Sequence, residues 1–264
     1  EIIEPDDPWA YIGYWGDHQI IYLLKFLEFI ENYNPNALQN LFTQESFIYA
    51  NVPYKIKRYA DIVKNPKDTI EFDYKLDEKL QHNKLEFGAD ALLLQNEKHQ
   101  IHQVNFIEKI LATILSKLSN FIPEAGIWMN TQRPEWNDAN NALVGNGVSV
   151  VTLCYLRRFM VFFLEILEKS TLEEIKVSQE LIDFYKSTRK IFEDNQHLLA
   201  NKISDTDRKL IVDALGETAS SYRWHIYEHG FWGTKRSISL SGLKRFCRVA
   251  LEFINHTIQA NERE

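Results

Sequence analysis

The chain is poor in cysteine, lacks a basic segment and has no long uninterrupted apolar run, and each absence excludes a class of protein. Two cysteines in 264 residues are too few for a disulfide framework. Lys and Arg number 30 against 37 for Asp and Glu, which gives a formal charge of −7, and no basic run exceeds two residues. We therefore expect no nucleic-acid partner and no anionic membrane surface.

The most apolar segment, residues 150–167, is interrupted at its middle by Arg157 and Arg158. Each arginine would cost roughly 3 kcal/mol at a bilayer centre, so the segment predicts a core helix. Cys154 and Cys247 lie in apolar helical stretches, and we expect two buried thiols in a reducing compartment, the cytoplasm. The chain opens at Glu1 without methionine, so the lack of a signal peptide does not decide its compartment.

Apolar residues at helical spacing predict an all-α fold. Asp17 is placed as the N-cap of the first helix, Thr171 and Glu174 form a capping box, and Ser204 with Asp207 forms another cap. Prolines, dense charge and weak periodicity predict a long irregular loop with short elements over residues 34–99. No βαβ pattern is present, so we expect one domain, residues 1–264, of antiparallel helical hairpins. The expected helices cover residues 17–33, 100–120, 146–169, 171–199, 204–222 and 239–260.

The most informative segment is 132–149, QRPEWNDANNALVGNGVS. It places Glu135, Trp136, Asn137 and Asp138 side by side, before a turn that contains Gly145. An indole suits the C–H face of a sugar, amides suit its hydroxyls, and a carboxyl can supply a proton. The alternative interpretation is a solvated helix entrance, because Asn and Asp also cap helices and form turns.

This segment resembles the Trp-Asn-Asp segment of the cellobiose and chitobiose phosphorylases, in the six-hairpin glycosidase superfamily. A second similarity is YWGDHQIIYLLKFL, residues 14–27. The resemblance implies part of an (α/α)6 toroid, and the two segments place about 150 residues of the chain within it. The sugar-clamping and phosphate-binding loops of that family have no counterpart here, so we expect an interior piece of a longer chain. Its partners would be the rest of the toroid or flanking domains.

The resemblance also implies an activity, namely cleavage or phosphorolysis of a glycosidic bond in a disaccharide or oligosaccharide, with inversion. By position, Asp138 would be the general acid and Trp136 the sugar platform. Glu135 stands where the family has Asp, and it joins Asn137 and Arg133 as cleft residues. No cofactor is implied beyond inorganic phosphate as a possible co-substrate. The alternative function is a non-catalytic helical module that binds carbohydrate or a neighbouring domain.

A general acid at position 138 must stay protonated near neutral pH, well above the ordinary aspartate pKa of about 3.9. Burial against Trp136 and the like charge of Glu135 would raise the pKa of Asp138. Hydrolysis with inversion also needs a second carboxylate as base, and phosphorolysis does not. Asp17 and Glu124 are candidates for this base.

Trp15, Asp17 and Trp128 are also assigned to the binding surface, with an alternative beside each. Trp15 and Trp128 would contact sugar, although an indole in a loop also serves packing. Asp17 would line the cleft or would serve only as the helix N-cap. Arg133 would contact ligand or would pair with a loop carboxylate.

Metal and anion patterns compete with the carbohydrate interpretation. HIYEH at 225–229 matches a zinc-protease pattern, but Gly230 ends the helix at once, and we expect no metal site there or at the spaced pair His99 and His102. Lys235 and its neighbours lack phosphate-loop spacing, and a serine cap at Ser239 or Ser241 is favoured there.

Overall fold

The fold is mostly helical, as the sequence predicts. The computed structural model describes residues 17–98, 100–130 and 145–262, with the side chains of 17–19 and 89 left out. Its described α-helices are α1 (Asp17–Tyr33), α2 (Tyr59–Lys64), α3 (Tyr74–Phe87), α4 (Phe106–Leu118), α6 (Val150–Glu168), α7 (Gln179–Asn195), α8 (Asp205–His229) and α9 (Leu240–Asn261).

Small antiparallel sheets join distant parts of the chain. β1 (Phe47–Ile48) pairs with β4 (Gln103–Val104), and β2 (Tyr54–Ile56) pairs with β3 (Ile70–Phe72). β5 (Phe121–Ile122), β6 (Gly126–Trp128) and β7 (Val148–Ser149) form a three-stranded sheet, and β8 (Glu174–Ser178) pairs with β9 (Lys235–Ser239). Short 3-10 helices lie between these elements, at Leu38–Leu41, Gly88–Leu92 and Gln196–Ala200.

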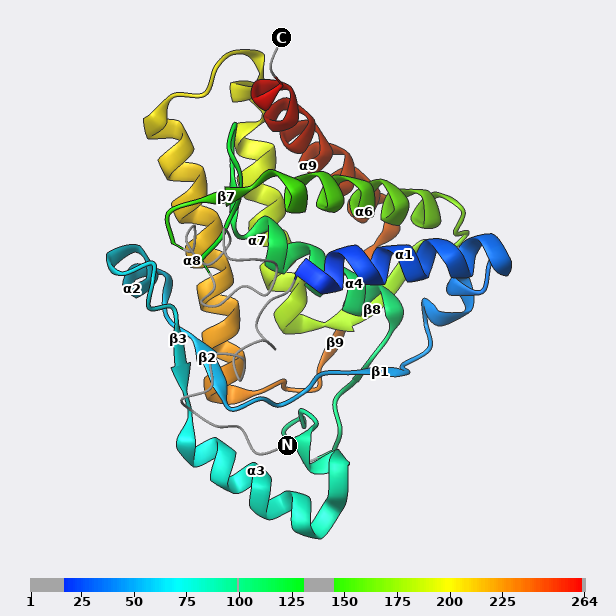
Figure 1. The fold of residues 1–264 in the computed structure, drawn as a ribbon. Coiled ribbons are helices and arrows are strands. Elements are labelled where there is room, and N and C mark those ends of the chain that lie inside the picture. The colour runs from blue at the N-terminus through cyan, green and yellow to red at the C-terminus, as the bar shows by residue number, and fades with distance from the viewer. Residues whose placement is uncertain (1–16, 99, 131–144, 263–264) are drawn as a thin grey trace.

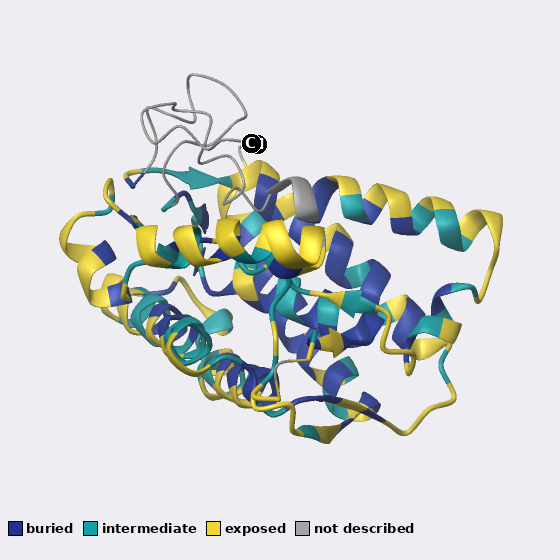
Figure 2. Cartoon of the chain, turned by 90° about the horizontal axis from the view of Figure 1, so that it is seen from below, coloured by how far each residue is buried: buried dark blue, intermediate teal, exposed yellow. Residues whose placement is uncertain are grey.

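The apolar core lies between the inward faces of α1, α4, α6, α7, α8 and α9. Figure 1 shows α1 and α6 running side by side, with α9 crossing behind α6 and α8 forming one side of the molecule. In Figure 2 buried positions collect on the inward helix faces and exposed positions on the outward ones. α4 is the most deeply enclosed helix of this set, because apolar residues cover most of its circumference.

The two arginines in the apolar helix α6 lie on its surface, and each joins α6 to a neighbouring helix. Arg158 makes two hydrogen bonds to the Glu28 carboxylate of α1, at 2.8 and 2.6 Å. Arg157 donates to Asn255 of α9 at 2.5 Å. α6 is therefore a core helix with a polar outer edge, as predicted. No helix in the described ranges is long and apolar enough to cross a bilayer.

Two cap predictions are confirmed, those at Ser204 and Ser239. α1 covers the predicted range, Asp17–Tyr33, whereas the N-cap role of Asp17 stays a prediction because its side chain is not described. The Ser204 hydroxyl accepts the Asp207 N–H at 3.1 Å and starts α8. Ser239 accepts the Gly242 N–H at 3.2 Å and starts α9. Gly230 ends α8 with a φ of 69°, a conformation that glycine adopts without strain.

Three predictions were wrong in detail. Residues 34–99 contain more than the short elements expected there, because α3 is a fourteen-residue helix, which Asp73 caps. Thr171 and Glu174 do not cap a helix, since residues 174–178 form strand β8 and α7 begins only at Gln179. Cys154 is exposed, whereas Cys247 is buried as expected, and both thiols are free.

Candidate functional site

Most of the predicted site residues fall outside the described part of the chain. This applies to Trp15, Arg133, Glu135, Trp136, Asn137 and Asp138. Their assigned roles stay predictions. What the structure does describe is the framework on either side of residues 131–144.

Backbone hydrogen bonds beyond the ends of β6 and β7 join the residues on either side of that segment. The Met129 N–H donates to the Gly147 carbonyl at 3.0 Å, and the Gly145 N–H donates back to Met129 at 2.6 Å. The half-buried Trp128 indole donates its Nε1–H to the Gly145 carbonyl at 3.1 Å. Gly145 has a φ of 80°, and a Cβ there would lie 2.6 Å from the Pro66 carbonyl oxygen. Trp128 therefore binds the backbone at Gly145, a structural role that agrees with the alternative interpretation of this indole as a packing residue.

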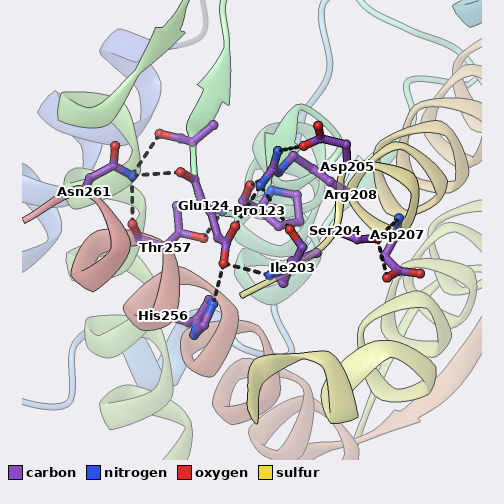
Figure 3. Close-up of polar contacts among 11 residues, drawn as sticks. Pro123, Glu124, Ile203, Ser204, Asp205, Asp207, Arg208, His256, Thr257 and Asn261 are labelled. Atoms are coloured by element: carbon purple, nitrogen blue, oxygen red, sulfur yellow. Dashed lines mark hydrogen bonds and ion pairs between the residues drawn. The ribbon is translucent and has the colours of Figure 1, made fainter. Parts of the chain in front are cut away.

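Glu124 is the candidate base whose side chain the structure describes, and its carboxylate is fully engaged (Figure 3). One oxygen accepts the Ile203 N–H at 2.9 Å and lies 3.2 Å from His256 Nε2, and the other accepts from Arg208 at 2.7 Å. The Glu124 N–H in turn donates to the Thr257 hydroxyl at 3.0 Å. The carboxylate thus joins the β5–β6 turn to the start of α8 and to α9.

The electrostatics of Glu124 also oppose a role as base. Burial raises the pKa of its carboxyl, but the Ile203 N–H, Arg208 and His256 outweigh burial and hold that pKa below its ordinary value. A carboxylate with its lone pairs occupied in this way is a structural anchor, so the proposed base must be sought elsewhere.

A pocket of about 410 Å³ lies between α7 and α8. The side of α7 that lines it carries Glu180, Asp183, Phe184 and Ser187. The facing side of α8 contributes Glu217, Thr218, Ser221, Tyr222 and His225, and Trp232 from the following turn completes the wall. The spacing of these positions, one or two per helical turn, places each set on a single helix face.

Trp232 is held at the pocket by its own backbone. Its N–H donates to Glu180 Oε1 at 2.8 Å, and its ring meets the His225 ring edge-on at 4.9 Å between centroids. Gly230 and Gly233 on either side both have positive φ, so the turn folds back toward α8. The indole remains 46% exposed, which leaves it free to contact a ligand.

A buried polar chain behind the pocket fixes the start of α7. The Ser178 N–H donates to Glu108 Oε2 at 2.9 Å, and His102 Nε2 lies 3.0 Å from the Ser178 hydroxyl. All three side chains are almost completely buried. The His102 ring stacks on Phe231 at 4.1 Å. Because Ser178 ends β8 one residue before α7, this chain sets the position of Glu180.

The buried groups near the pocket have displaced pKa values. Burial raises the pKa of the Glu108 carboxyl, and the nearby charge of Glu180 adds to that effect. Burial, together with the charges of Glu108 and Glu180, raises the pKa of the Tyr222 phenol. Tyr222 therefore stays a neutral hydroxyl, able to donate and accept hydrogen bonds at the pocket wall.

Sequence reasoning noticed the aromatic turn around Trp232 but missed the acids on α7 and α8. The available signal was the recurrence of Glu180, Asp183 and Ser187 at helical spacing, but solvated helix faces show the same spacing. Only the pairing of α7 with α8 turns these positions into a pocket wall.

The zinc pattern at residues 225–229 does not form a ligand cluster. His225 and His229 lie 5.1 Å apart between ring centroids, and His225 belongs to the pocket wall. Within the described ranges no three His, Cys, Asp or Glu side chains are grouped to hold a metal. Comparison with protein-family models and with curated proteins finds no match for the chain.

Proposed function

We propose that this chain is a carbohydrate-active enzyme domain that binds a saccharide in the α7–α8 pocket and cleaves or phosphorolyses a glycosidic bond. One observation carries the proposal: an exposed indole, Trp232, stands beside three carboxylates in a pocket of about 410 Å³. That volume lies in the range of roughly 300–1,000 Å³ typical of small-molecule sites.

The chemistry of the lining fits a sugar. A pyranose presents C–H groups on its faces, which pack against an indole, and hydroxyls at its edges, which need acceptors. Glu180, Asp183 and Glu217 supply carboxylate acceptors, and Ser221 and Tyr222 supply hydroxyls that both donate and accept. An aromatic platform bordered by acceptors is the arrangement that a polyhydroxylated ligand requires.

The catalytic part of the proposal retains Asp138 as proton donor and Trp136 as a second sugar platform. Hydrolysis with inversion needs another carboxylate to activate water, about 6.5–9.5 Å from the acid. Glu217 and Asp183 replace Glu124 as the candidates for this base, because both line the pocket and both are exposed.

The charge of the pocket favours water over phosphate as acceptor. Phosphate binding draws on Arg, Lys or helix N-termini, and the ten lining residues that the structure describes include no Arg and no Lys. Phosphorolysis would need an anion site contributed by another part of the protein.

The finer fold that we propose is part of an (α/α) toroid. The packing of α7 against α8 and of α6 against α9 supports it. The outward face of α1 supports it too. Four aromatic residues, each more than half exposed, lie on this face, opposite the buried one: Tyr22, Phe26, Phe29 and Tyr33. Their spacing of four, three and four positions places them in one stripe along the helix. A further helix of the same toroid would cover such a stripe.

The test is turnover of oligosaccharides by the full-length protein and its Asp138→Asn variant, with and without phosphate. We expect the variant to lose about 10²–10⁴-fold in kcat while it keeps its affinity for saccharide, since only proton donation is removed. Release of sugar-1-phosphate would identify phosphorolysis.

Two other outcomes would revise the proposal. Unchanged turnover in the variant would remove Asp138 from the mechanism. Saccharide binding by the wild-type protein without turnover of any substrate would identify the alternative, a non-catalytic carbohydrate-binding module.

A further inference from the structure

The α7–α8 pocket carries negative charge without basic side chains to balance it. Glu180, Asp183 and Glu217 line it, and among its described lining residues there is neither Lys nor Arg. Asp183 accepts a hydrogen bond from the neutral Gln179, at 2.8 Å. The His225 ring also lines the wall, and its Nε2 is buried with no hydrogen-bond partner among the described residues.

The wall of the pocket contains a buried carboxylate in which one of the two oxygens has a hydrogen-bond partner among the described residues and the other has none. Glu180 is 5% exposed, and its Oε1 accepts the Trp232 N–H at 2.8 Å. Its Oε2 has no hydrogen-bond partner in the part of the chain that the structure describes. A buried carboxylate oxygen without a partner calls for a donor or a positive charge nearby.

Burial, and after it the charge of Glu180, raise the pKa of a second buried acid, Glu108. Glu108 is 0% exposed; one of its oxygens accepts the Ser178 N–H, and the other has no partner among the described residues. Because a raised pKa favours the neutral form of Glu108, the negative charge at the pocket rests on the acids that line it, and that charge favours a cation.

Aromatic rings on the same wall also suit a cation. Phe184 and Tyr222 stack at 4.8 Å between ring centroids, and Trp232 exposes its indole. The faces of such rings attract ammonium groups, with an indole the strongest. Carboxylates and aromatic faces together favour an ammonium group over a neutral hydroxyl.

We infer that the saccharide bound in this pocket carries a protonated amine, as a glucosamine unit does. The inference rests on the proposed function, because it names the class of sugar that the same pocket takes. The ammonium group would lie among Glu180, Asp183 and Glu217, and the sugar ring would pack against Trp232.

The experiment is a calorimetric titration of the full chain with two matched probes, a β-1,4-linked glucosamine tetramer and its fully N-acetylated counterpart. The two share ring and linkage and differ in charge. We expect the amine form to bind at least tenfold more tightly at low salt, and we expect this preference to shrink as salt screens the charges.

Single variants locate the charge. Asp183→Asn and Glu217→Gln change exposed side chains and keep an oxygen that can accept from a sugar hydroxyl. Each should weaken binding of the amine tetramer about three- to tenfold more than it weakens binding of the acetylated tetramer. Asp194→Asn is the matched control, because it removes a carboxylate from α7 that does not line the pocket.

The outcomes separate the inference from the proposed function. Equal affinity for the two tetramers overturns the inference and leaves a saccharide site in place. Failure of both tetramers and of neutral oligosaccharides to bind overturns the proposed function and the inference together.

Discussion

At the scale of single residues, His102 shows how folding changes a titratable group near the pocket. Its ring stacks on Phe231 and lies 3.0 Å from the Ser178 hydroxyl through Nε2. Burial, reinforced by the charge of Lys235 and opposed by Glu45, lowers the pKa of His102 to about 4. The folded protein therefore holds this imidazole neutral at pH values where the unfolded chain, with an ordinary histidine pKa of about 6.5, already binds a proton.

This difference predicts a loss of stability on acidification. Between about pH 6.5 and about pH 4, His102 is protonated in the unfolded state but stays neutral in the folded state. Acidification across this range therefore lowers the free energy of unfolding by up to about 1.4 kcal/mol per pH unit from this group. His102→Phe keeps a ring on Phe231 but removes the titration. We expect urea denaturation at pH 7, 6 and 5 to give a flatter pH dependence for the variant. Parallel profiles for the two proteins would refute the assignment.

At the same scale, the sequence predicted residue types better than residue roles. Glu124 and Trp128 stood out as an acid and an indole in an expected loop; Glu124 lies in the β5–β6 turn, whereas Trp128 is the last residue of strand β6. Their roles depend on partners far along the chain, Arg208 and His256 for Glu124 and the Gly145 carbonyl for Trp128. No local pattern contains such contacts, so the sequence alone does not distinguish a structural residue from a catalytic one.

At the scale of elements, the packing of α2 on α8 depends on the absence of a side chain. Gly216 lies inside α8, where glycine is usually unfavourable by about 1 kcal/mol relative to alanine. A Cβ at this position would lie 2.2 Å from the Tyr59 ring. Tyr59 is also held by hydrogen bonds, with its N–H to Ser220 at 3.0 Å and its hydroxyl to Asp213 at 2.7 Å. The ring therefore has little freedom to move aside.

Gly216→Ala should accordingly destabilise the protein by about 1–3 kcal/mol, despite the better helix propensity of alanine. In a Tyr59→Ala background the clash is gone, and the same substitution should become stabilising by up to about 1 kcal/mol. Chemical denaturation of the four proteins in this double-mutant cycle measures the change of sign. A Gly216→Ala protein as stable as the wild type would contradict the packing described.

Among the elements, those with strong apolar periodicity were predictable, and those fixed by tertiary pairing or by charge were not. α1, α6 and α9 have apolar stripes and lie close to their predicted ranges. α3 was missed because it is polar and buries only Leu80. β8 was predicted as the start of a helix because the Thr171–Glu174 spacing fits a capping box. In the structure Ile175 and Val177 pair instead with β9, about sixty residues later in the chain, and no local pattern contains that pairing.

At the scale of the whole molecule, the candidate site exists only because separate elements meet. Two helices supply its acids, and the glycine turn after α8 brings in Trp232. The buried chain of His102, Ser178 and Glu108 ties α4 to the start of α7 and so positions the α7 wall of the pocket. The helical class follows from sequence pattern, and the pocket follows from this assembly.

The most direct test of the central claim, that the α7–α8 pocket binds a saccharide against Trp232, is a titration of oligosaccharides into the wild type, Trp232→Ala and Trp224→Ala. Trp224 is the matched control, because it belongs to α8 but packs against Arg58 and does not line the pocket. We predict that Trp232→Ala weakens binding at least tenfold, about 1.4 kcal/mol, and that Trp224→Ala changes it less than twofold. Equal affinity in Trp232→Ala and the wild type would contradict the account.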